Sequence, residues 1–249
     1  MRLGATLALL VVTLTPACGS GAGLFRQYEY EEETYLALDG TATVYVNSSV
    51  PALNALRGSH FDTKPGAAIE KSAVASFFDA AGVQVTRVTF SRRNDRVYLH
   101  VRMSVDDDRT LGSTRPFDWS TYAFSQDGDL MLYRQSVGPL TPGADAGKAV
   151  AWTGDELVAF RLHIPSKVPY HNAGADNLKR GNILVWEQPL TDRLRGAPLT
   201  LEARMQTQSI LYRTVWLFGA TFVAVAIGFA LVIWWVMRRG APQAPVGQL

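Results

Sequence analysis

The sequence predicts an α+β protein: a mainly antiparallel β-sheet ectodomain with one or two packed helices, followed by one C-terminal transmembrane helix. Three observations lead to this class. Apolar and polar residues alternate over several short segments, which is typical of strands that bury one face. One region repeats its apolar residues at helical spacing instead. Near the C-terminus lies a charge-free apolar run that is long enough to cross a bilayer.

Composition limits the possible classes of function. The chain has 249 residues, with 24 Lys+Arg against 22 Asp+Glu and a formal net charge of +2. Between its two apolar ends lie about 190 residues, enough for one sizeable core or two small subdomains. The basic residues are scattered rather than gathered in a stripe with aromatic residues, so we expect no nucleic-acid partner.

The N-terminal residues 1–22 are typical of a signal peptide: one arginine, an apolar run from Leu3 to Leu14, and small residues after it. The run is too short to span a bilayer. Two alternatives remain for its processing. Cys18 is the lipid attachment site of a lipoprotein-type signal, or the chain is cleaved after Ala17 or Ala22. Since Cys18 is the only cysteine, the mature ectodomain is expected to lack disulfides.

The predicted transmembrane helix covers 212–237. Its central part, Val215–Met237, is 23 residues without a charge, which makes about 34 Å of helix. Aromatic residues mark both ends, and Arg238 and Arg239 follow directly. By the positive-inside rule the tail 238–249 is cytoplasmic, and the region 24–210 is an extracytoplasmic ectodomain on a bacterial cell membrane. Ala220, Ala224 and Gly228 share one stripe, where a membrane protein partner or a second copy of the span can pack closely.

The ectodomain shows mostly strand periodicity. Alternation is complete from Val97 to Val105, and Asp39–Gly40 and Asp127–Gly128 predict hairpin turns. A change of phase predicts a bulge near Thr86–Arg87. Further strands are predicted at 158–164, 182–186 and 199–205, and helices at 51–57 and 69–78. We therefore expect one sheet with one face covered by helix.

Two segments, 36–56 and mainly 160–205, resemble the LppM-type domain of bacterial envelope lipoproteins. The matching positions in the second segment are Pro165, Lys167, Val168, Asn172, Gly181, Asn182 and Trp186. Ser166 and Ala173 depart from the family pattern, which has glycine at both places. The resemblance implies an envelope location and a role in handling lipid or glycolipid, and it assigns no functional residue.

No catalytic, cofactor or metal site is predicted, because the four histidines fall in no recognised motif. The best candidate for binding is an anion or headgroup patch on outward-facing strand positions: His100, Arg102, Arg161 and His163. It requires that their two strands be neighbours. Lys167 and His171 are candidate contacts in an exposed connection. The carboxylates at 29, 31–33 and 106–108 are expected to be solvated.

Three hypotheses of function follow. The first is a non-enzymatic envelope protein whose ectodomain binds membrane lipid, glycolipid or a protein partner. The second is an assembly or regulatory subunit that acts through the transmembrane helix. The third is a membrane-tethered hydrolase. The sequence leaves open the ligand, the partner, the oligomeric state and any enzymatic activity.

Overall fold

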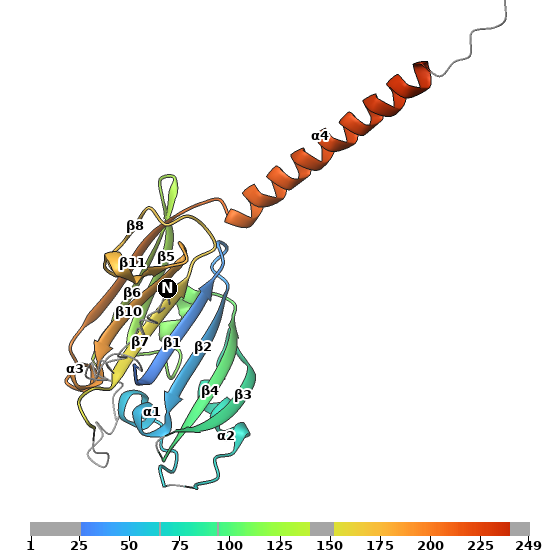
Figure 1. Cartoon of the computed structure of the whole chain (residues 1–249). Coiled ribbons are helices and arrows are strands. Elements are labelled where there is room, and N and C mark those ends of the chain that lie inside the picture. Colours follow the sequence, from blue (N-terminus) through green and yellow to red (C-terminus); the bar gives the residue numbers. More distant parts are fainter. Residues whose placement is uncertain (1–25, 65, 94, 140–151, 240–249) are drawn as a thin grey trace, which may run out of the picture.

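The computed structural model describes residues 26–239 except 65, 94 and 140–151. Two β-sheets pack face to face, and one long helix extends away from them (Figure 1). The α+β class is confirmed. Cys18 and the tail from residue 240 lie outside the described residues.

The larger sheet has seven strands in the order β3-β4-β2-β1-β7-β10-β9. Neighbouring strands are antiparallel except β1 and β7, which are parallel. The strands are β1 (Tyr28–Leu36), β2 (Ala42–Ser49), β3 (Val83–Arg93), β4 (Arg96–Val105), β7 (Leu157–His163), β9 (Leu178–Lys179) and β10 (Ile183–Pro189).

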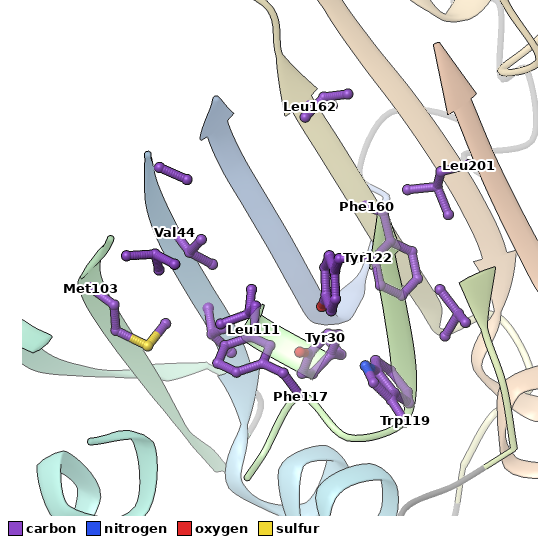
Figure 2. Packing of buried hydrophobic residues seen from close by; sticks show 14 of the residues in the cluster. Tyr30, Val44, Met103, Leu111, Phe117, Trp119, Tyr122, Phe160, Leu162 and Leu201 are labelled. Carbon is purple, nitrogen blue, oxygen red and sulfur yellow. The ribbon is translucent and has the colours of Figure 1, made fainter. Parts of the chain in front are cut away.

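The smaller sheet has four antiparallel strands in the order β5-β6-β11-β8. They are β5 (Ser120–Asp127), β6 (Leu130–Val137), β8 (Tyr170–His171) and β11 (Leu199–Gln206). This sheet covers the inner face of the larger one, and residues of both build one hydrophobic cluster (Figure 2). The single sheet covered by helix that we expected is instead two sheets, because β5, β6, β8 and β11 pair with one another and cover the face of the larger sheet.

The short α-helices lie at the end of the sandwich away from the long helix (Figure 1). In α1 (Val50–Arg57) the Ser49 hydroxyl accepts from the Ala52 N–H at 3.2 Å, which caps the first turn. Gly58 ends the helix in the left-handed conformation, with φ of 65°. The others are α2 (Lys71–Phe78), α3 (Leu190–Leu194), and the 3₁₀ helices η1 (Asp108–Ser113) and η2 (Ala175–Asn177).

The predicted turns and bulge are confirmed. Gly40 and Gly128 stand in the two hairpin turns with positive φ, 91° and 60°. The register of β3 against β4 shifts between Val85 and Arg87. Because a bulge inserts one residue, the positions after it exchange faces. Val83 and Val85 therefore face the core before the bulge, whereas Ser91 faces outward after it, across from Tyr98.

The long helix, α4 (Ile210–Arg239), follows β11 after a short connection. Its first N–H donates to the Pro165 carbonyl at 3.0 Å, and the helix then projects from the sandwich with its apolar side chains exposed (Figure 1). Within the described residues it is the one helix long and apolar enough to cross a membrane.

Candidate functional site

The outer face of the seven-stranded sheet, which is the face turned away from the core, carries most of the polar side chains that could bind a ligand or take part in a reaction. Alternation along each strand puts one set of residues in the core and the other set on this face. Its central members, by strand, are Ser91 and Arg93 of β3; Tyr98, His100 and Arg102 of β4; Thr43, Tyr45 and Asn47 of β2; Glu31, Glu33 and Tyr35 of β1; and Arg161 and His163 of β7.

The four residues of the predicted anion patch all lie on the outer face, but their strands are not neighbours. Strands β2 and β1 separate β4, which carries His100 and Arg102, from β7, which carries Arg161 and His163. These two pairs of residues are therefore about 14 Å apart. The intervening β1 carries carboxylates: Glu31 pairs with Arg161, and Glu33 accepts from His163 at 2.6 Å. The structure therefore forms a face of alternating, paired charges rather than one cationic cluster.

At the β3 side of this face, four side chains form a continuous chain of hydrogen bonds. Ser91 Oγ lies 2.8 Å from His100 Nε2, and His100 Nδ1 lies 2.8 Å from Asn47 Oδ1. The amide nitrogen of Asn47 donates to Glu31 at 3.3 Å. We call this set of four residues the relay.

The relay fixes the protonation of its histidine. Because the Asn47 amide nitrogen is directed to a carboxylate, its oxygen faces His100 and accepts from Nδ1–H. Nε2 is then the bare nitrogen, and it accepts from the Ser91 hydroxyl. Partial burial lowers the pKa of His100, and the Glu31 charge opposes this only in part. The imidazole is consequently neutral near pH 7.

The relay borders a pocket of about 270 Å³. Arg93 forms part of its wall, where its guanidinium donates to the Tyr98 hydroxyl at 3.1 Å and to the Tyr28 carbonyl at 3.3 Å. The full lining is Tyr28, Glu31, Asn47, Ser91, Arg93, Tyr98 and His100. The pocket thus combines a cation, a neutral base, a hydroxyl and two phenol rings.

Along β1 from the relay, aromatic rings form a surface that we call the aromatic ledge: Tyr35, Tyr45 and His163. The Tyr35 ring stacks on the His163 ring with centroids 3.8 Å apart and planes 14° apart. Tyr45 meets Tyr35 edge-on at 5.5 Å. Tyr35 remains 42% exposed. Hydrogen bonding from His163, helped by its charge, lowers the pKa of Glu33 beneath the ledge.

A second charged cluster lies between the sheets, and the sequence did not indicate it. Arg57 donates to the Tyr30 hydroxyl at 2.7 Å and to Glu32 at 3.1 Å. Glu32 also accepts from Tyr122 at 3.0 Å and from Gln135 at 2.9 Å. Arg57 and Glu32 are almost completely buried. The expected solvated glutamate face is therefore corrected: Glu31 and Glu33 face outward, whereas Glu32 points into the core (Figure 2 shows the surrounding rings). Glu29 is also buried, and its carboxylate accepts from the Tyr98 hydroxyl at 2.7 Å.

Other carboxylates and cations are buried around this cluster. Arg193 is buried against the Trp119 ring, and burial together with the Arg57 charge lowers the pKa of Arg193 to about 10. Asp108, expected to be solvated, is buried in η1, and burial with the Glu32 charge raises its pKa to about 7. Because Arg57, Glu32, Arg193 and Asp108 are almost completely buried, we interpret this cluster as structural.

The remaining candidate residues lie apart from both clusters. Lys167 is exposed between β7 and β8, and His171 is half-buried in β8 of the smaller sheet. Ala220 and Ala224 line a shallow apolar groove on α4 with Tyr212 and Trp216, and Gly228 lies further along the same helix. Over the described ranges, no group of three or more His, Asp or Glu side chains is placed to hold a metal ion.

Fold and site together define a two-sheet α+β domain that bears a polar and aromatic outer face and continues into one apolar helix. Comparisons with protein-family models and with curated proteins give no match. Among solved structures, the NMR structure of the folded domain of LppM from Mycobacterium tuberculosis is similar, with a TM-score of 0.41 and 12% identity over 74% of this chain and 92% of that one. A similarity at this level assigns neither a family nor a function.

Proposed function

We propose that this chain is a membrane-anchored protein of the bacterial envelope whose ectodomain binds a carbohydrate-type ligand, the head of a glycolipid or a glycan, on its outer face. The observation that carries the proposal is the aromatic ledge. Tyr35 is stacked on His163 and meets Tyr45 edge-on, and with 42% of its surface exposed it leaves part of an aromatic ring open to solvent. Apolar ring faces with a polar rim suit ligands that have both C–H faces and hydroxyl groups.

Paired charges next to the ledge favour a neutral polyol over an anionic headgroup. Arg161 and His163 are engaged by Glu31 and Glu33, so an anion would have to displace a carboxylate that is already held. A hydroxyl group needs no such exchange, since it donates to the carboxylates and accepts from the guanidinium and amide groups. The pocket at the relay extends this polar surface with Asn47 and Arg93.

Anchoring through α4 supports the envelope location. The helix has 30 residues and ends in Arg238 and Arg239, whose guanidinium groups lie 5.0 and 4.0 Å from the ring centroids of Trp234 and Trp235. Aromatic and cationic side chains at one end of an apolar helix fit a membrane interface, and the arginines favour the cytoplasmic side. The signal-like N-terminus agrees with export of the ectodomain.

Binding of soluble oligosaccharides and of glycolipid-containing vesicles to the full-length protein tests the proposal. Tyr35→Ala should weaken binding about fivefold, because one ring contact contributes on the order of 1 kcal/mol. Tyr170→Ala is the matched control, since Tyr170 is similarly exposed but lies on the smaller sheet. Binding only to anionic vesicles, abolished by salt and unchanged in Tyr35→Ala, would contradict the proposal.

A second candidate function is supported by the shallow groove on α4. There Ala220 and Ala224, with Gly219 beside them, leave the helix backbone accessible along one side. Small residues at this spacing permit close packing of another transmembrane helix. The chain would then be an assembly or regulatory subunit of a membrane complex.

A further inference from the structure

The relay has a property that ligand binding alone does not require: it prepares one hydroxyl group for attack. Ser91 donates to a histidine whose opposite nitrogen is held by a side-chain oxygen. A hydroxyl next to a neutral imidazole that is itself oriented by a third group is the geometry of nucleophilic catalysis. Here the orienting group is the Asn47 amide, and Glu31 in turn orients the amide.

The sheet itself sets this geometry. Asn47 of β2 pairs directly with His100 of β4, and Ser91 of β3 pairs with Tyr98, two residues before His100. All three side chains project from the same face because the bulge at Val85–Arg87 turns Ser91 outward. Three adjacent strands of a seven-stranded sheet hold the groups more rigidly than a loop would.

The pocket beside the relay offers a place for a reacting group. It is lined by Ser91, His100 and Arg93, so a carbonyl carbon held at the hydroxyl would lie near a guanidinium. Arg93 stands two residues from Ser91 on the same face of β3. Its position is fixed by hydrogen bonds to the Tyr98 hydroxyl and the Tyr28 carbonyl. A fixed cation beside the nucleophile stabilises the negative charge that forms on the carbonyl oxygen.

We propose that Ser91 is the nucleophile of an acyl-transfer site, with His100 as its general base and Asn47 as the residue that positions the histidine. The substrate class is a carboxylic ester, and on the outer face proposed above for glycans it is an O-acyl group carried by a polyol. The site shares its pocket with the proposed binding function but does not require the ligand to be a glycan.

The reaction balances without a co-reactant other than water. Ser91 Oγ forms a bond to the carbonyl carbon of the ester while its proton passes to His100 Nε2. The bond from that carbon to the alcohol oxygen breaks, and the imidazolium returns the proton to the leaving alcohol. A water molecule then attacks the acyl-serine, again with His100 taking and returning a proton. The products are a carboxylic acid and the alcohol released in the first step, and the Ser91 hydroxyl is regenerated.

Covalent labelling by a fluorophosphonate tests the proposal directly, because the reagent records an activated serine even where turnover is slow. The full-length protein in detergent is treated with the reagent, and the modified residue is identified by mass spectrometry. We expect modification at Ser91, loss of labelling in Ser91→Ala, and a rate lowered at least about 100-fold in His100→Ala. Ser125→Ala, which removes an exposed strand serine of the smaller sheet, should leave the rate unchanged.

The pH dependence separates an activated serine from an ordinary one. Since burial lowers the pKa of His100, the labelling rate should rise with pH while the imidazole loses its proton. The rate should then stay constant from about pH 7 upward. Asn47→Ala should slow labelling and change this profile, because the imidazole loses the partner that fixes its tautomer. The proposal is overturned if Ser91 is not modified, if another serine reacts as fast, or if the rate is independent of His100.

Two variants distinguish failure of this inference from failure of the binding function. Ser91→Ala should abolish labelling, whereas any loss of oligosaccharide binding should be smaller than in Tyr35→Ala. Tyr35→Ala should weaken binding while the small reagent still modifies Ser91, because the ledge does not contact the relay serine. Labelling without any glycan binding would contradict only the binding proposal, and binding without labelling would contradict only the acyl-transfer site.

Discussion

The guanidinium of Arg57 lies over the indole ring of Trp119, 3.5 Å from its centroid, between the two sheets. Arg57 comes from α1 and Trp119 from the segment just before β5, so the contact joins the larger sheet's helix to the smaller sheet. The same guanidinium pairs with the buried Glu32. A cation between an aromatic ring and a carboxylate thus connects the two layers.

Replacing Arg57 should therefore destabilise the domain strongly. Arg57→Met leaves the Glu32 carboxylate buried without its cation, which costs about 3–5 kcal/mol. Arg134→Met is the matched control, because Arg134 is half-exposed in its pair with Glu202 and should cost less than about 1 kcal/mol. Thermal unfolding of the full-length protein measures both. Equal losses would contradict this interpretation, and adding Glu32→Gln to Arg57→Met should restore part of the stability.

The buried carboxyl of Asp108 should make stability depend on pH. Burial raises its pKa from 3.8 to about 7 in the folded state. The folded protein therefore holds a proton that the unfolded chain releases, and stability falls as pH rises between these values. The decline in the free energy of unfolding amounts to a few kcal/mol at most. Asp108→Asn should remove this decline and stabilise the protein above pH 7. Asp129→Asn, in an exposed turn, should keep the wild-type profile of unfolding temperature against pH.

A close backbone approach at Gly112 should tolerate no side chain. A Cβ at this position would lie 2.3 Å from the Ser120 carbonyl oxygen, where η1 packs on β5. Gly112→Ala must shift one of the two elements, at a cost of about 1–3 kcal/mol. Ser113→Ala, one residue later and exposed, loses only the hydroxyl's bond to Thr110, worth about 1 kcal/mol. Unfolding in urea compares the two, and a harmless Gly112→Ala would show that the packing is looser.

Local signals in the sequence predicted much of the fold. Both hairpin turns, the bulge in β3 and the start of α1 depend on residues within a few positions of one another, so their patterns carry over directly to the structure. The bulge matters most, since it determines that Ser91 faces outward. Neither the second sheet nor the parallel pairing of β1 with β7 has such a local signal.

The site required contacts between distant residues. His100 could be assigned to an outward face from its strand alone, but its partner Asn47 is 53 residues away. The glutamates of β1 look alike in sequence, yet Glu32 meets Gln135 103 residues later and is buried. A sequence pattern gives the face of a strand and not the strand order, which is why the four residues of the predicted anion patch could not be separated into two distant pairs.

If the chain acts as a subunit through α4, replacing the small residues of its stripe with larger ones should disrupt the complex. Ala220→Leu combined with Gly228→Leu fills the side on which a partner helix would approach. Ala226→Leu is the control, because position 226 lies on the opposite side of the helix. Native mass spectrometry of the protein released from membranes gives the mass of the complex. The same mass in all variants would count against this role.

Thiol labelling at the aromatic ledge in intact cells tests the central claim most directly. Thr43 pairs with Tyr35 across β1 and β2, so Thr43→Cys places a thiol beside the ledge, and the wild-type chain measures any reaction of Cys18. We predict that a membrane-impermeant maleimide labels this cysteine from outside and that the bound glycan ligand slows the reaction. Labelling only after the cells are permeabilised would contradict an extracytoplasmic binding face.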